Sequence, residues 1–102
     1  MKFSELNFKE GLPSFNIFKN YPDSQHFSAV TMHDEMLIIL YDDYTIDLGF
    51  YGGVYNIVIV SAFDVEWKPF YSKEVYYAED VFKNLQKVID NAPRYFKLKS
   101  FI

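Results

Sequence analysis

Five carboxylates in the middle of the sequence are the side chains whose type and spacing could do chemistry. They are Asp42, Asp43, Asp47, Asp64 and Glu66, and no Lys or Arg occurs between residues 20 and 67. Two carboxylates on either side of a sugar linkage can hydrolyse it, one as acid and the other as base or nucleophile. That chemistry needs a cleft, which a small domain seldom forms, and adjacent Asp residues are also typical of a turn. A small hydrolase is therefore an alternative, but we expect a protein without catalytic residues.

Two other patterns that can signal chemistry have simpler explanations. The triplet His-Asp-Glu at 33–35 contains metal-binding residue types, but adjacent residues in a turn or strand rarely converge on one ion. The only other histidine is His26. Gly52 and Gly53 lead into a strand-like run, without the Lys and the glycine spacing of a phosphate-binding loop. We expect no metal and no cofactor, and we interpret the glycine pair as a hairpin turn.

The size and composition of the chain favour one globular domain. With 102 residues, half of them apolar and a fifth aromatic, the chain can bury a core as a single domain over residues 1–102. It has no cysteine, which excludes disulfides and thiolate metal sites and fits a reducing cytoplasm. No apolar run reaches the roughly 18 to 20 residues that span a bilayer. We expect a soluble, cytoplasmic protein with no membrane partner.

The charges are distributed unevenly along the chain. The net charge is −4, but residues 20–67 carry eight acidic residues and no Lys or Arg, while residues 68–102 carry seven basic and four acidic residues. One interpretation is ordinary solubilising charge on the surface of a sheet. The other is a negative face that attracts a basic protein partner. Direct binding of nucleic acid is disfavoured, because phosphate contacts need a basic patch.

Three runs in the middle of the chain predict an antiparallel meander. They are rich in Ile, Val, Leu, Tyr and Phe, and they cover residues 35–41, 44–51 and 54–63. Two-residue connections favour turns with positive φ, where Gly is favourable and Asp is tolerated. We therefore expect such turns at Asp42-Asp43 and at Gly52-Gly53. Alternation along the second run places Asp47 on the more polar face of the sheet.

One strong helical pattern follows the strands. In residues 78–92 a single apolar stripe is formed by Val81, Phe82, Leu85, Val88 and Ile89. Pro93 disfavours helical geometry in the residue before it, so we expect the helix to end there.

The flanking segments are predicted to add further extended structure. Residues 68–77 are expected to form a fourth strand, and residues 94–101 could return to the edge of the sheet. Residues 14–18 could be an edge strand, residues 20–24 a turn and residues 26–31 a short strand. The predicted fold is α+β, an antiparallel β-meander with one long C-terminal amphipathic helix packed on one face.

Aromatic side chains are more numerous than one sheet face and one helix can readily bury. The candidates are Tyr41, Tyr51, Tyr55, Trp67, Phe70, Tyr76 and Tyr77. Most are expected in the core, but Tyr and Trp are also common anchors of protein interfaces. Aromatic rings beside carboxylates suit a partner rich in Lys and Arg, because cation–π contacts add to the ionic attraction.

Part of the chain resembles a known class of bacterial proteins. The strand Ile-Asp-Leu-Gly-Phe-Tyr at 46–51, the segment Asp-Val-Glu-Trp-Lys-Pro at 64–69 and the helix after them carry the likeness, which covers residues 46–90. This pattern is similar to the immunity proteins of contact-dependent growth inhibition systems. The resemblance implies a cytoplasmic protein that binds the C-terminal toxin domain of a large exported effector. Such toxins are often nucleases, which are commonly basic because they bind nucleic acid.

We therefore predict an immunity protein that neutralises a cognate toxin domain by direct binding, without catalysis. The expected partner-binding residues combine charge and packing: Asp42, Asp43, Asp47, Tyr51, Tyr55, Asp64, Glu66 and Trp67. The alternative is an acidic inhibitor from a phage or mobile element, of the anti-restriction or anti-CRISPR type, that mimics the charge of nucleic acid. The sequence leaves the oligomeric state open.

Overall fold

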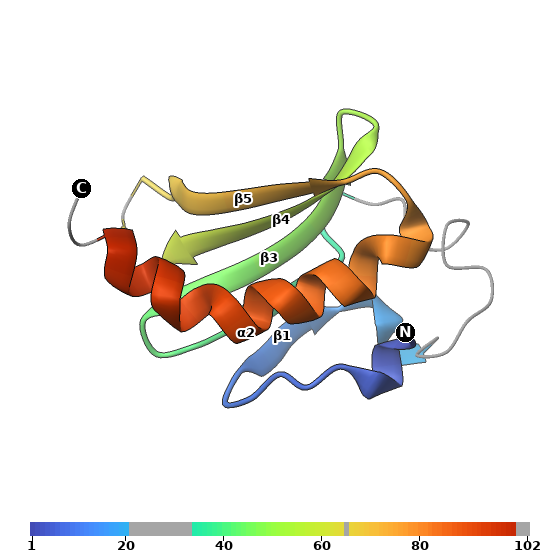
Figure 1. Ribbon diagram of the computed structural model, residues 1–102, viewed down its shortest axis with the longest axis horizontal. Coiled ribbons are helices and arrows are strands. Elements are labelled where there is room, and N and C mark those ends of the chain that lie inside the picture. The colour runs from blue at the N-terminus through green and yellow to red at the C-terminus, as the bar shows by residue number, and fades with distance from the viewer. Residues whose placement is uncertain (21–33, 65, 100–102) are drawn as a thin grey trace.

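The fold is one antiparallel sheet with a long helix across one of its faces (Figure 1). The computed structural model describes residues 1–20, 34–64 and 66–99. The strands are β1 (Leu12–Asn16), β2 (Leu37–Leu40), β3 (Tyr44–Tyr51), β4 (Val54–Ser61) and β5 (Pro69–Val75). They lie in the order β1-β2-β3-β4-β5, so each strand pairs with its neighbour in the sequence. The helix α2 spans Val81–Lys99 and confirms the predicted α+β architecture.

Three short 3₁₀ turns complete the described chain: η1 (Phe3–Glu5), η2 (Ile17–Asn20) and η3 (Ala78–Asp80), the last of which leads directly into α2. The expected edge strand at 14–18 is found two residues earlier, as β1. The expected short strand at 26–31, and the expected turn at 20–24 apart from Asn20, lie outside the described residues. None of the helices in the described part of the chain is long and apolar enough to cross a membrane.

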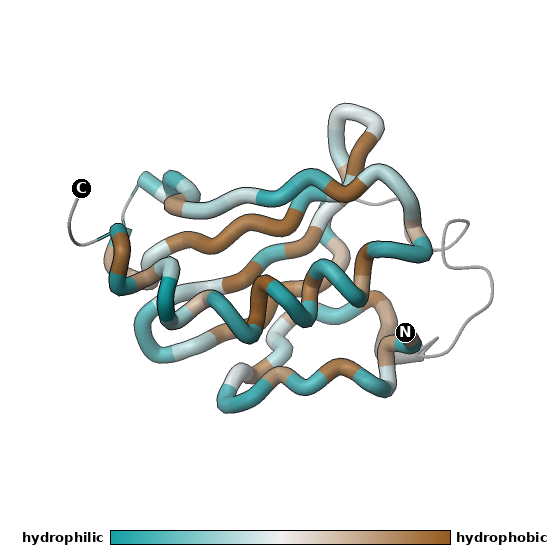
Figure 2. Tube along the Cα trace, viewed as in Figure 1, coloured by the Kyte–Doolittle hydropathy of each residue, from teal (hydrophilic) through white to brown (hydrophobic). Residues whose placement is uncertain are grey.

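The core lies between the helix and the inner face of the sheet. Ile46 and Leu48 of β3 are fully buried there, as alternation along this strand predicts. The predicted stripe of α2 is buried against them, and Ala92 extends it. Figure 2 shows the hydrophobic residues concentrated on the central strands, while the helix alternates between hydrophobic and hydrophilic residues. The spacing of apolar residues in the strands and in the helix therefore identifies the core correctly.

The two hairpin turns differ from each other. Gly52 and Gly53 have φ values of +64° and +82°, which confirms the predicted positive-φ turn between β3 and β4. The same prediction is wrong for Asp42 and Asp43, neither of which has a positive φ. Three residues, 41–43, connect the end of β2 at Leu40 to the start of β3 at Tyr44, and the Tyr41 N–H donates to the Tyr44 carbonyl at 2.9 Å. Asp, unlike Gly, has a Cβ atom that makes left-handed backbone unfavourable, and this turn forms without it.

The predicted end of the helix at Pro93 is also wrong. Helix α2 continues through Pro93 to Lys99, so residues 94–99 do not return to the sheet as extended structure. Tyr95 stacks on Tyr71 of β5 with ring centroids 4.2 Å apart, and Phe96 packs 5.7 Å from Tyr44. Proline costs a backbone hydrogen bond in a helix, but these aromatic contacts lie beyond it and offset that cost.

Candidate functional site

The outer face of the sheet is the face turned away from α2, and strand pairing identifies its residues. Paired residues point to the same side of a sheet. Ile39 and Ile46 are paired and buried under the helix, so the alternate pairs point outward. One outward row crosses all five strands: Phe15, Ile38, Asp47, Val58 and Ser72. The predicted site residue Asp47 is therefore the middle residue of the row, on the middle strand.

Asp47 is a partly buried carboxylate with apolar neighbours. Its two partners across the sheet are Ile38 and Val58, both half-buried. Its Oδ1 atom is buried and has no hydrogen-bond partner in the described part of the chain. Burial, the negative charge of Glu35 and a hydrogen bond with the Glu35 side chain raise the pKa of Asp47 from 3.8 to about 7. The carboxylate therefore lacks the cation or donors that would favour its charged form.

The residues that precede β2 bring more negative charge to this face. The carbonyl oxygen of Asp34 lies where a Cβ atom on Gly49 would stand, and the Tyr51 ring approaches the same position. Burial raises the pKa of Tyr51, and the charges of Asp47, Glu35 and Asp34 raise it further. Three carboxylates therefore act on one tyrosine. Of the predicted site residues, the structure brings Asp47 and Tyr51 together here.

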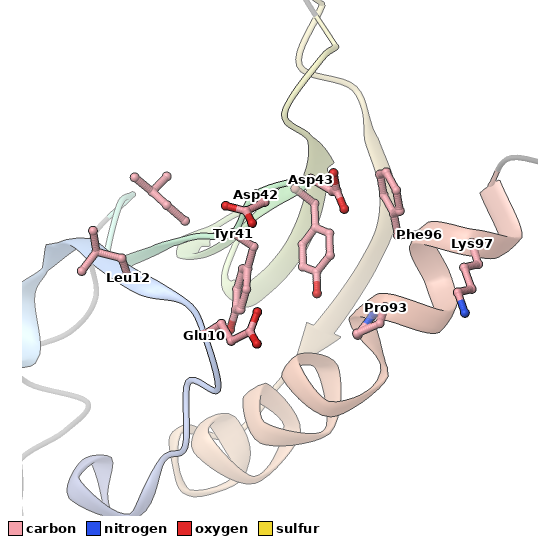
Figure 3. Close-up of a pocket in the computed structure, with 10 residues that line it drawn as sticks. Glu10, Leu12, Tyr41, Asp42, Asp43, Pro93, Phe96 and Lys97 are labelled. Atoms are coloured by element: carbon pink, nitrogen blue, oxygen red, sulfur yellow. The ribbon is translucent and has the colours of Figure 1, made fainter.

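The turn between β2 and β3 forms a second acidic region at one end of the sheet. Asp42 and Asp43 are exposed there and line a cleft of about 590 Å³, with Pro93, Phe96 and Lys97 from α2 also lining it (Figure 3). The Tyr41 hydroxyl, also in the cleft, donates a hydrogen bond to the carbonyl of Phe8 at 2.8 Å. Burial is the main cause that raises the pKa of Tyr41, so its hydroxyl remains a neutral donor.

The connection between β4 and β5 lies at the same end of the sheet as this turn, since the Ala62 N–H donates to the Asp43 carbonyl at 3.0 Å. Asp64 accepts hydrogen bonds from the backbone N–H groups of Glu66 at 2.9 Å and Lys68 at 3.3 Å. Glu66 forms an exposed ion pair with Lys68 at 2.9 Å. Both predicted carboxylates are thus engaged within their own loop.

Trp67 and Tyr55 have opposite environments. Trp67 is 64% exposed in this connection, and its φ of +56° is unusual for a residue with a side chain. Tyr55 is only 4% exposed, and its ring packs edge-on against Phe50 with centroids 4.9 Å apart. The prediction that Tyr55 contacts a partner is not compatible with this burial, because its place in the alternation of β4 points it into the core.

The helix on the opposite side of the sheet carries positive charge. Residues 81–99 contain five basic residues and one acidic residue, Asp90, which lies 3.6 Å from Lys9. The strands β2, β3 and β4 contain no Lys or Arg, and Lys73 of β5 pairs with the inward-facing Ile57. The described strands therefore place no cation on the outer face, and the two sides of the molecule differ in charge.

Sequence reasoning missed the apolar residues and the acidic neighbour that surround Asp47. Phe15 and Leu40 are 44% and 42% exposed on the outer face, and Glu35 interacts directly with the Asp47 carboxyl. Alternation within 35–41 could have placed Ile38 and Leu40 on the face of Asp47. The contribution of Phe15 depends on the pairing of β1 with β2, which includes a register shift after Pro13.

The described residues contain no group of three side chains that could hold a metal ion, and His26 and His33 lie outside them. The carboxylates suit ionic and hydrogen-bonding contacts with a cationic partner. Comparisons with protein-family models, with curated proteins and with solved structures find nothing that matches this chain.

Proposed function

We propose that this protein is an inhibitor that acts by binding a basic protein domain. Its specific role would be that of an immunity protein, which neutralises a cognate toxin domain of a contact-dependent growth inhibition system in the cytoplasm. The observation that carries the proposal is the separation of charge. Asp34, Glu35 and Asp47 lie at the outer face, whose described strands carry no Lys or Arg, whereas the helix on the other side of the sheet has a net charge of +4.

This separation would orient a basic partner before contact. A negative surface attracts and steers a positive one, which raises the association rate and disfavours partners of the wrong charge. A toxin that cleaves nucleic acid needs a basic substrate surface, because it must bind phosphates. An acidic protein that covers that surface would block the substrate. No catalytic group of the inhibitor is required for this effect.

The environment of the carboxylates supports a protein interface more than a mimic of nucleic acid. A mimic of the phosphate backbone needs many freely exposed charges, whereas Asp64 is bonded within its loop and Glu66 is paired with Lys68. Asp47 lies between two aliphatic residues of the sheet. A carboxylate within an apolar surface can anchor a protein partner through a desolvated ion pair, which a row of free charges does not provide.

Co-expression with the C-terminal domain encoded directly upstream of this gene tests the proposal. We expect the domain alone to arrest growth, this protein to restore it, and the two to elute together from a sizing column. Growth arrest that persists, with no complex on the column, would contradict the proposal.

Charge reversal then tests whether the acidic turn raises the rate at which the two proteins associate. Changing Asp42→Lys and Asp43→Lys should slow association and weaken its dependence on salt. The matched control reverses one carboxylate of η3 and one of α2, Glu79→Lys and Asp90→Lys, with the same change in net charge. We expect the control variant to associate faster than the variant with both Asp42→Lys and Asp43→Lys.

A further inference from the structure

The outer face has the composition of a binding surface around one acidic centre. Phe15, Ile38 and Val58 lie in the same row as Asp47, and Leu40 lies in the next row, opposite Thr45. Phe15 and Leu40 are exposed despite their size. Interfaces typically combine an apolar centre with a few charged anchors and a polar rim. A partner that fits this arrangement would present apolar side chains around one positively charged side chain.

Asp47 lacks the counter-charge that its environment requires. A carboxylate removed from water is unfavourable unless a cation or hydrogen-bond donors compensate it. Among the described residues, its Oδ1 atom has no donor, and the side chain that interacts with it, Glu35, is also acidic. Lys and Arg are absent from all outward positions of the described strands. A partner that supplies one cation would therefore form a contact and also remove the free-energy cost of a carboxylate without a counter-charge.

We propose that the outer face of the sheet is the surface that binds the basic partner, with an Arg or Lys side chain of the partner paired to Asp47 and apolar side chains of the partner on Phe15 and Leu40. This inference rests on the proposed function for the basic nature of the partner. It adds the surface, the orientation and the anchor. The partner approaches from the side of the sheet opposite α2, the far side in Figure 1.

A second copy of the chain is a poorer occupant of this face. A symmetric pair through the outer faces would bring Asp47 and Glu35 of one copy against the same carboxylates of the other. Docking of the basic helix of one copy onto the outer face of the next would be a head-to-tail contact, which forms rings or open chains. Light scattering tests both possibilities. We expect a monomer at all concentrations, and self-association that Asp47→Asn abolishes would overturn the proposal.

Dissociation constants for the upstream-encoded toxin domain test the proposal directly. We expect Asp47→Asn to weaken binding by about 30-fold, mainly through faster dissociation, because it removes the anchor of the ion pair. Phe15→Ala should weaken binding by about tenfold through lost packing. The double variant Asp42→Lys, Asp43→Lys is the control, since it should change the association rate far more than the dissociation rate. All variants should keep the dispersed amide spectrum of the folded protein.

If the complex forms but Asp47→Asn and Phe15→Ala bind as tightly as the unmodified protein, the outer face is not the interface and the proposal falls. The proposed function would survive that result. A probe that needs no toxin also tests the surface: titration of the labelled protein with a hexa-arginine peptide. Amide shifts grouped at Ile38, Asp47 and Val58 would support the proposal. Shifts confined to the turn at Asp42 and Asp43 would overturn it.

Discussion

The backbone carbonyl of Asp34 lies directly over Gly49, in the space that a Cβ atom on Gly49 would occupy. Gly49 has no left-handed φ and belongs to no turn, so the need for glycine here is steric. This contact brings the chain before β2 across the outer face. Glu35 consequently lies close enough to Asp47 to raise the pKa of its carboxyl.

Gly49→Ala is predicted to destabilise the fold by about 1–3 kcal/mol, because the new methyl group must displace the Asp34 backbone or the Tyr51 ring. Chemical denaturation measures this change. Ser72→Ala, at an exposed position of β5 on the same face, should change the free energy of unfolding by less than about 0.5 kcal/mol. Equal stabilities for the two variants would show that a methyl group at position 49 does not clash with the Asp34 backbone.

The pKa of Asp47 predicts a pH dependence of stability with a definite sign. Its folded value of about 7 lies above its ordinary value of 3.8, so the folded protein holds this proton over a pH range in which the unfolded chain has lost it. The free energy of unfolding should therefore fall as the pH rises through that range, from about 4 to about 7.

The Asp47→Asn variant has no carboxyl to ionise at this position, so its stability should not decrease over this pH range. At pH 8 the substitution should therefore raise the free energy of unfolding by about 1–2 kcal/mol. This figure is well below the value of the full shift, because the carboxyl is partly exposed. Thermal or chemical denaturation at several pH values measures it, with Asp42→Asn in the exposed turn as the control. The same pH slope in the Asp47→Asn variant and the unmodified protein would contradict this assignment.

The last turns of α2 are predicted to depend on aromatic packing beyond Pro93. Tyr95→Ala removes the stacking of Tyr95 on Tyr71 and should destabilise the protein by about 1–3 kcal/mol, with a loss of helical circular dichroism. Leu98→Ala, at an exposed position of the same turns, should have little effect. A Tyr95→Ala variant with unchanged helicity and stability would show that the helix passes Pro93 for another reason.

Trp67 is held in left-handed backbone by its loop, and Trp67→Gly is predicted to stabilise the fold by about 1 kcal/mol. The side chain is exposed, so its removal costs little packing. Denaturation measures the gain, and Trp67→Ala, which loses the ring but keeps a Cβ atom, is the matched control. If glycine and alanine have the same effect, the backbone of Trp67 is not strained.

The sequence predicts the fold well where apolar residues recur with one regular spacing along a segment. The alternation of Tyr44–Tyr51 sets the two faces of β3, and the apolar stripe of α2 sets its buried side. The errors occur where tertiary contacts override a local preference. Pro93 favours the end of a helix, but the contacts of Tyr95 and Phe96 lie beyond it. At Asp42 and Asp43, the turn forms without the left-handed backbone that a two-residue connection favours.

The candidate site was predicted less completely than the fold, because a surface depends on pairing between distant segments. The absence of cations from residues 20–67 indicates an acidic region, but it does not distinguish Asp47 on a face from Asp64 inside a loop. Phe15 joins the site only through the register of β1. The residue type of Tyr55 predicts a place in an interface, whereas its position in the strand points it inward.

The number of protons released when the partner binds tests the role of Asp47 most directly. In the free protein, at about one pH unit below its pKa of about 7, Asp47 is almost fully protonated, with Glu35, Asp34 and Tyr51 as its titratable neighbours. A partner cation would lower the pKa of Asp47 and displace that proton. Calorimetric titration with the toxin domain in two buffers of different ionisation enthalpy counts the protons. We predict release of about one proton by the unmodified protein and almost none by Asp47→Asn. The same count for both proteins would contradict the claim that a cation of the partner pairs with Asp47.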